Sequence, residues 1–252
     1  VRKDKDIEII NKLNNKNLKP ILLDVSNYTS CLNVKEFILQ ETKRLNLPFI
    51  ALVNNAGISR KLPVEFHDIN DAKRVFDTNY FGPLQLTQLF LPLLRESQGR
   101  IIMTSSITGF LARPIDSVYS SSKHALEALS DSLRRELAHF NISISLIEPA
   151  FVKTEIFDRS QSAGEEILSS NYEQMISLYG KFYTQSKKDS YKHQISIAPD
   201  ATITSEAILH SITSPTPFTR YPVSSAFGIS ANAMRWLSKL APDRLLDMIL
   251  EK

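Results

Sequence analysis

The feature that most constrains the fold is a regular alternation of short apolar runs with longer helical patterns. Four runs are rich in aliphatic and β-branched residues and apolar on both faces, as strands inside a parallel sheet must be. These runs are Pro20–Val25, Phe49–Val53, Arg100–Ser105 and Ile142–Pro149. Helices are expected at about Asp4–Asn15, Leu32–Leu45, Ile69–Glu96 with a kink at Pro92, and Val118–Phe140. Because strands and helices alternate, we expect an α/β fold built on a doubly wound parallel sheet.

Length and composition limit the class of protein. A chain of 252 residues without an internal repeat suits one domain over 1–252. Its 30 basic and 27 acidic residues are interleaved and give a net charge of +3, which argues against a nucleic-acid partner. The single cysteine, Cys31, excludes an internal disulfide and any cysteine-based metal cluster, and it fits a reducing compartment. We expect no metal site. The apolar run Leu89–Leu94 is too short to span a membrane, and Val1 is followed by charged residues rather than a signal sequence. We therefore expect a cytoplasmic protein.

Small or polar residues follow three of the predicted strands. The sequence NNAG, Asn54–Gly57, follows the second run, Ser106 follows the third, and Ala150–Thr154 follows the fourth. Since the carboxyl ends of parallel strands meet at one edge of a sheet, where ligands bind in such folds, these residues should converge.

A tyrosine and a lysine stand one helical turn apart in VYSSSKHALEAL. Tyr119 and Lys123 should project from the same helix face, where the ammonium group would favour the phenolate and lower the pKa of the phenol. Such a phenol can act as a general acid or base near neutral pH. The pair alone also fits a chance arrangement on a solvated helix.

In these motifs the chain resembles the short-chain dehydrogenase/reductase family, and within it the steroid and retinol dehydrogenase-like branch. The matching segments, in the family's order, are Asn54–Gly57, FDTNYFG around Asn79, Ser105–Gly109, Tyr119–Lys123 and Glu148–Thr154. The resemblance implies a Rossmann fold and hydride transfer between a nicotinamide cofactor and an alcohol or carbonyl carbon. In it Tyr119 would move the proton, Lys123 would hold the nicotinamide ribose, Ser106 would bind the substrate oxygen, and Asn79 would bind a relay water. Asn79 could instead be a polar residue satisfied inside its helix.

The resemblance also implies a cofactor site. Besides Tyr119 and Lys123, its residues would be Arg2, Asp24, Val25, Asn54, Ala56, Val152 and Thr154. Asp24 could instead be a strand-end turn residue. Arg2 favours NADP over NAD, because a basic residue there can pair with a 2′-phosphate, although a solvated arginine is the simple alternative. The family's first strand and glycine-rich turn would precede Val1, so we expect a truncated chain that is unstable or inactive as it stands. The family's Pro-Gly is Pro149–Ala150 here.

The segment 150–198 is expected to form a variable lid over the substrate. Its aromatic stripe at 172, 175, 179 and 182 fits either a pocket lining or a packed helix face. Ser106, Phe110, Phe151 and Phe157 are the expected substrate contacts, and they suggest an apolar alcohol or carbonyl compound such as a steroid, a retinoid or another lipid.

The C-terminal helical segment 230–252 packs on the body or docks on a membrane or a second subunit. The resemblance implies a homodimer or homotetramer. A second hypothesis is a catalytically silent dinucleotide-binding regulator or scaffold of the same fold.

Overall fold

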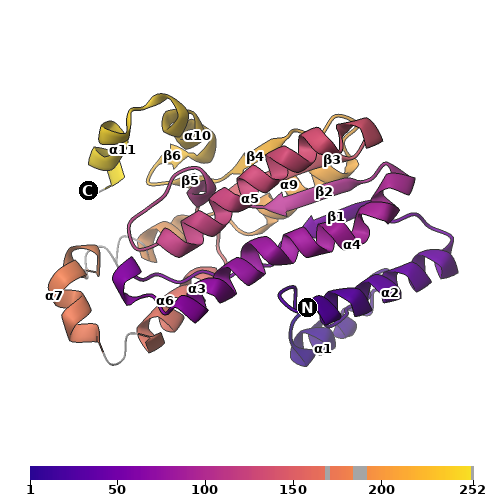
Figure 1. The fold of residues 1–252 in the computed structure, drawn as a ribbon, viewed down its shortest axis with the longest axis horizontal. Coiled ribbons are helices and arrows are strands. Elements are labelled where there is room, and N and C mark those ends of the chain that lie inside the picture. The colour runs from indigo at the N-terminus through magenta and orange to yellow at the C-terminus, as the bar shows by residue number, and fades with distance from the viewer. Residues whose placement is uncertain (168–170, 184–191, 251–252) are drawn as a thin grey trace.

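The centre of the molecule is a four-stranded parallel sheet. The computed structural model describes residues 1–167, 171–183 and 192–250. The strands are β1 (Ala51–Asn54), β2 (Arg100–Thr104), β3 (Ser143–Pro149) and β4 (Arg220–Val223). They lie in the order β1-β2-β3-β4, so each strand pairs in parallel with the next along the chain. All four therefore end at one edge of the sheet, as the sequence predicted (Figure 1).

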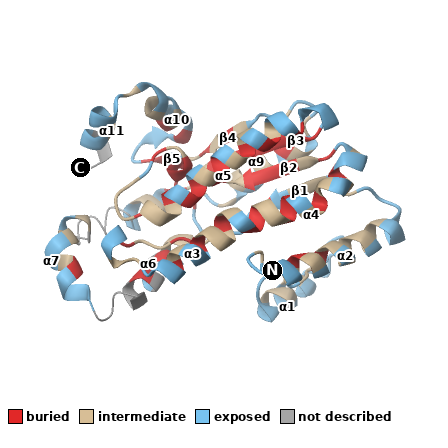
Figure 2. Ribbon diagram, viewed as in Figure 1, coloured by how far each residue is buried: buried red, intermediate tan, exposed pale blue. Residues whose placement is uncertain are grey.

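Helices cover both faces of this sheet. On one face lie α4 (Gly82–Ser97) and α5 (Ser117–Glu136), with α2 (Tyr28–Leu45) packed against α4, and on the other lies α9 (Thr202–Thr213) (Figure 1). The α4/α5 side buries a core that includes Leu94, Ile101, Met103, Leu126 and Ile144. The α9 side buries Ile102, Ile147, Tyr221 and Val223. The buried residues are concentrated in the sheet and in the faces of the helices that meet it (Figure 2).

Two expected elements differ from those observed. The predicted helix over 69–96 is divided into α3 (Ile69–Phe76), a π-helical turn (Asp77–Phe81) and α4, which continues through Pro92 as one helix. The run Pro20–Val25 is not a strand. Towards the amino terminus it makes two backbone hydrogen bonds, both to Val1: the Val1 amino group donates to Ile21 O, and the Val1 carbonyl accepts from Leu23 N. Two such bonds do not make a ladder, and a large cavity separates this segment from β1.

The remaining elements lie outside the central sheet and the helices that cover it. They are α1 (Asp4–Lys12), α6 (Ile156–Ile167), α7 (Tyr172–Tyr183), the hairpin β5 (Ser225–Ala226) and β6 (Ile229–Ser230), α10 (Ala231–Leu240) and α11 (Asp243–Leu250). Short 3-10 turns occupy 64–66, 107–109 and 138–140. None of the helices in the described part of the chain has the length and apolar character needed to cross a membrane.

The aromatic stripe of the expected lid lies on α7 and packs against the body. Met175 is fully buried beside Leu62, and the Tyr179 ring stands edge-on to the Phe66 ring at 6.0 Å between centroids. Met175 and Tyr179 thus form a packed helix face, whereas Tyr172 at the start of the stripe is exposed. Residues 168–170 and 184–191 of the expected lid lie outside the described residues.

Candidate active site

Tyr119 and Lys123 lie on the first two turns of α5, at the carboxyl edge of the sheet. The Lys123 Nζ atom is 5.8 Å from the centroid of the Tyr119 ring and donates a 2.7 Å hydrogen bond to the carbonyl of Thr104, the last residue of β2. Lys123 is 3% exposed, so this bond fixes its position within the protein. The one-turn spacing therefore brings the two groups together as expected.

The electrostatics of this pair differ from the expectation. Burial raises the pKa of Tyr119 to about 12, and a hydrogen bond from Ser106 opposes the shift, whereas the charge of Asp116 adds to it. Burial also lowers the pKa of Lys123 to about 8, against the opposing effect of Glu127. The prediction that Lys123 lowers the pKa of Tyr119 is therefore wrong for this structure. Desolvation, which disfavours both charged forms, outweighs the attraction between them.

Ser106 begins the 3-10 turn that follows β2. Its Oγ atom accepts from Thr108 N at 3.2 Å, and its side chain hydrogen-bonds to Tyr119. The turn can lie against α5 because of Gly109. A β-carbon built there would be 2.5 Å from Ser105 Oγ and 3.3 Å from the Lys123 carbonyl oxygen. Glycine at 109 thus allows the serine and the tyrosine to meet.

Asn79 is fully buried in the π-helical turn and uses both ends of its amide. Its Oδ1 accepts from Ile58 N, and its Nδ2 donates to Ile58 O and Ser122 Oγ, each at 2.9 Å. A β-carbon built on Gly57 would lie 3.5 Å from both Asn79 Oδ1 and Lys123 Nζ, so the two side chains converge on this glycine. Asn79 therefore joins the loop after β1 to α5, and its side-chain partners lie outside its own helix.

A cavity of about 480 Å³ opens beside these residues. Of the predicted site residues, Ser106, Tyr119, Lys123, Phe151, Val152, Thr154 and Phe157 line it. Phe110, expected at the substrate, is not among its lining residues, and its ring packs against the guanidinium group of Arg235 instead. The sequence position of Phe110, next to the serine motif, does not determine whether its side chain points into the cavity or away from it.

Three charged residues that the sequence analysis missed also line this cavity: Lys61, Arg113 and Asp116. Lys61 Nζ is 5.2 Å from the Phe157 ring centroid, and Arg113 Cζ is 5.9 Å from that of Phe151. Burial lowers the pKa of both cations. Arg113 and Asp116 lie between the serine and tyrosine motifs, which is the one sequence signal that could have drawn attention to them.

A second cavity, of about 1310 Å³, lies between β1 and the segment 23–26. It is lined by the other predicted cofactor residues, Arg2, Asp24, Val25, Asn54 and Ala56. Asp24 Oδ1 accepts from both Ser26 N and Ser26 Oγ, and these bonds, with the charge of Arg2, lower its pKa despite partial burial. Asp24 thus forms a turn with Ser26 at the cavity wall, although the segment before it is not a strand. The buried Asn54 Oδ1 atom has no hydrogen-bond partner among the described residues.

The two cavities are continuous. Residues that line both include Asn55 and Gly57 after β1 and Ile156 and Ser160 on α6. A single trough therefore runs along the carboxyl ends of the strands, from Asp24 to the Ser106–Tyr119–Lys123 cluster.

Comparisons with known proteins agree with this arrangement. The family model described as short chain dehydrogenase matches residues 1–165. The NADPH-dependent 3-dehydrocapnine reductase of Ornithobacterium rhinotracheale is 30% identical over 257 residues, which cover all of this chain and 86% of that protein. Human retinol dehydrogenase 5 is 31% identical over 250 residues, 96% of this chain and 76% of that protein. The crystal structure of a short-chain dehydrogenase from Streptomyces avermitilis superposes with a TM-score of 0.73 at 22% identity, over 100% of this chain and 85% of that one.

The chain belongs to the short-chain dehydrogenase family. It is an oxidoreductase with the Rossmann fold of that family.

Proposed function

We propose that this protein interconverts a secondary alcohol and a carbonyl compound by hydride transfer, with Ser106, Tyr119 and Lys123 at the reacting centre. The observation that carries the proposal is the convergence of these three residues at one cavity, which shares part of its lining with the larger cavity where the predicted cofactor residues lie. The family assignment supports the same reaction class.

The residues of the trough fit a nicotinamide dinucleotide. Asn54 offers a buried, unpaired amide oxygen, and Gly57 keeps the trough wall free of a side chain where Asn79 and Lys123 converge. Asp24 and Val25 would flank the adenine, whereas Val152 and Thr154 would contact the carboxamide. Arg2 and the NADPH dependence of the Ornithobacterium relative support NADP, with NAD as the alternative. Such a cofactor, when bound, supplies or accepts the hydride.

The protein's own residues handle the proton and the substrate oxygen. Tyr119 holds the proton of its phenol, since its pKa of about 12 keeps it protonated, and delivers this proton to a carbonyl oxygen during reduction. Ser106, which lies beside the phenol, would turn its hydroxyl to donate a hydrogen bond to the same oxygen. Lys123 stabilises the phenolate that remains. Reduction is therefore the direction that the resting protonation state favours.

We propose an apolar substrate, because Phe151, Phe157 and Ile208 line the 480 Å³ cavity. The name of the retinol dehydrogenase relative is consistent with this choice. A homodimer or homotetramer remains the proposed assembly.

The test is the absorbance of reduced cofactor at 340 nm with NADPH or NADH and a panel of apolar ketones and aldehydes. We expect the wild type to turn over at least one of these compounds. The kcat of the Tyr119→Phe variant should be lower by at least about a hundredfold, since general acid catalysis contributes that much. Tyr28→Phe is the matched control, because Tyr28 is exposed on α2. Cofactor binding without turnover of any carbonyl compound would favour the catalytically silent regulator instead.

A further inference from the structure

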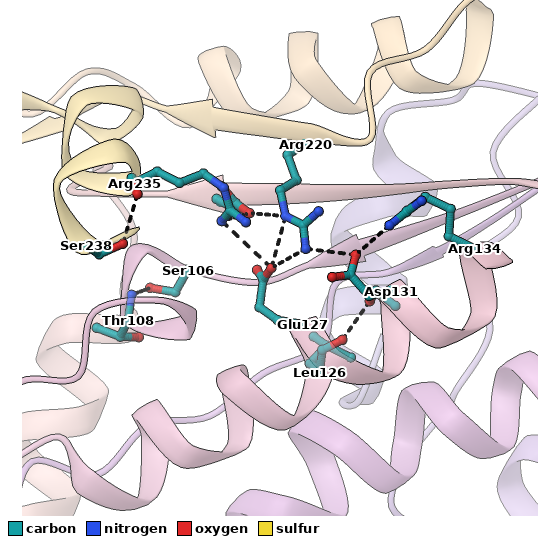
Figure 3. A network of polar contacts seen from close by, with 11 residues as sticks. Ser106, Thr108, Leu126, Glu127, Asp131, Arg134, Arg220, Arg235 and Ser238 are labelled. Carbon is teal, nitrogen blue, oxygen red and sulfur yellow. Dashed lines mark hydrogen bonds and ion pairs between the residues drawn. The ribbon is translucent and has the colours of Figure 1, made fainter. Parts of the chain in front are cut away.

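A network of charged side chains lies beside α5 and is most deeply buried at Glu148. It contains three carboxylates, Glu127, Asp131 and Glu148, and three arginines, Arg134, Arg220 and Arg235. Figure 3 shows Arg220 reaching both Glu127 and Asp131, with Arg235 approaching from the C-terminal helix α10. The network thus joins α5, β3, β4 and α10, which are far apart in the sequence.

Among the described residues, Arg235 is the arginine of this network that contacts the loop carrying Ser106. Its Nη1 atom donates to Glu148 Oε1 at 2.5 Å and lies 3.9 Å from Glu127 Oε2. The flat face of its guanidinium group covers the ring of Phe110, 5.0 Å from the ring centroid. Its side chain is 11% exposed, so these contacts are made out of bulk water, where a cation over an aromatic ring is worth most.

Phe110 ends the turn that begins at Ser106. Phe110 N and Leu111 N both donate to Ile107 O, which makes the segment one short hydrogen-bonded unit. On its other side the turn meets α5 at Gly109, where a β-carbon would be 3.2 Å from Glu127 Cγ. The turn is therefore held between α5 and the guanidinium group of Arg235.

We propose that Arg235 is a positioning residue, which clamps the Ser106–Phe110 turn against α5 and so sets the reach of the Ser106 hydroxyl toward Tyr119. The proposal rests on the proposed function for its kinetic consequence. Arg235 touches neither cavity, and it acts through Phe110 and Glu148.

The energetics of buried ion pairs favour a role for Arg235 in positioning the turn over a role in stabilising the fold. Desolvation of buried charges offsets much of their attraction, so such pairs add little net stability. Burial and the neighbouring Glu127 raise the pKa of Glu148 to about 8, despite the two arginines. What the directional contacts do provide is a fixed geometry, because each donor and acceptor must stay within hydrogen-bond reach.

The experiment compares Arg235→Met, which keeps the apolar stem, with the wild type. We expect kcat to fall by about ten- to a hundredfold, the cost of misplacing a catalytic group, while KM changes by less than about threefold. The pH profile of alcohol oxidation should move to higher pH, since Tyr119 loses the hydrogen bond that lowers its pKa. Arg235→Lys should recover part of kcat through its ion pair with Glu148.

Amide hydrogen exchange of residues 106–111 tests the clamp without turnover. Exchange should quicken at least about tenfold in Arg235→Met and in Phe110→Leu. Arg134→Met is the matched control, since Arg134 pairs with Asp131 in the same network and should leave both kcat and exchange unchanged. If Arg235→Met does not fold, the double variant with Glu148→Gln removes the buried carboxyl group that has lost one of its two arginine partners, and it should fold with a kcat lowered to the same extent.

Unchanged exchange at 106–111 in a folded Arg235→Met protein would overturn the clamp, as would equal losses in Arg134→Met. A wild-type protein without turnover overturns the proposed function, and the exchange comparison then still decides the clamp.

Discussion

Replacing Glu148 with glutamine should make the protein more stable at neutral and alkaline pH, although Glu148 sits between two arginines. The side chain is fully buried, and burial and then Glu127 raise its pKa from 4.5 to about 8. A carboxyl whose pKa is raised on folding contributes stability below its unfolded pKa and loses that contribution as the pH rises through the folded value. The wild type should therefore become less stable between about pH 4.5 and 8.

The size of the effect follows from proton linkage. One proton that the folded state retains and the unfolded state has released changes the free energy of unfolding by roughly 1 kcal/mol per pH unit. Between about pH 5.5 and 7.5 the wild type should lose about 2 kcal/mol from this site, and Glu148→Gln should lose none. Other titrating groups, such as His67, are present in both proteins and cancel in the comparison.

The assay is urea unfolding of both proteins at the two pH values, followed by circular dichroism. Glu41→Gln is the control, because Arg44 and Lys19 lower the pKa of Glu41 to about 2 and it stays ionised throughout. Its curves should therefore run parallel to the wild type. Parallel pH dependence of the wild type and Glu148→Gln would refute the reasoning, since it would mean that Arg220 and Arg235 keep Glu148 ionised.

Four further substitutions probe the supports of the site and two helices outside it. Asn79→Ala should lower the free energy of unfolding by about 3 kcal/mol in urea titrations, because three buried hydrogen bonds are each worth about 1 kcal/mol. Gly109→Ala should cost about 1–3 kcal/mol by overpacking and lower kcat, whereas Gly180→Ala on α7, where a β-carbon meets only Ile176 at 3.6 Å, should stabilise slightly in thermal melts. Asn27→Ala removes the cap that accepts from Ser30 N and should cost about 1 kcal/mol by the same unfolding assay.

The strands were predictable where burial is complete. Ile101, Ile102 and Met103 are all fully buried, so β2 is recognisable in the sequence as an uninterrupted apolar run. Its predicted bounds differ from the observed ones by one residue. The run Pro20–Val25 is similarly apolar, but a strand also needs a neighbour that is hydrogen-bonded along its length, and here two bonds to Val1 take the place of such a ladder. The π-helical turn at Asp77–Phe81 depends on Asn79 reaching Ile58 and Ser122, which no local pattern encodes.

In the site, too, features set by neighbouring residues could be predicted from the sequence, whereas features set by distant residues could not. The one-turn spacing of Tyr119 and Lys123 is local, so their proximity could be predicted. Their pKa values could not, because desolvation is set by the whole of the surrounding fold and here it reverses the expected direction for the tyrosine. Arg235 and Glu148 are 87 residues apart, and nothing in either neighbourhood marks them as partners.

The catalytic helix α5 is held by directional contacts on both sides of the Tyr119–Lys123 turn. Ser122 accepts from Asn79 on one side, and four residues beyond Lys123, Glu127 bonds to Arg220 on the other. Apolar packing alone fixes how deep a helix lies but tolerates small rotations about its axis, whereas hydrogen bonds to buried partners do not. A rotation that moved the Tyr119 hydroxyl away from Ser106 would break one of these two contacts. The polar residues that flank the pair, rather than the pair itself, therefore determine where the phenol points.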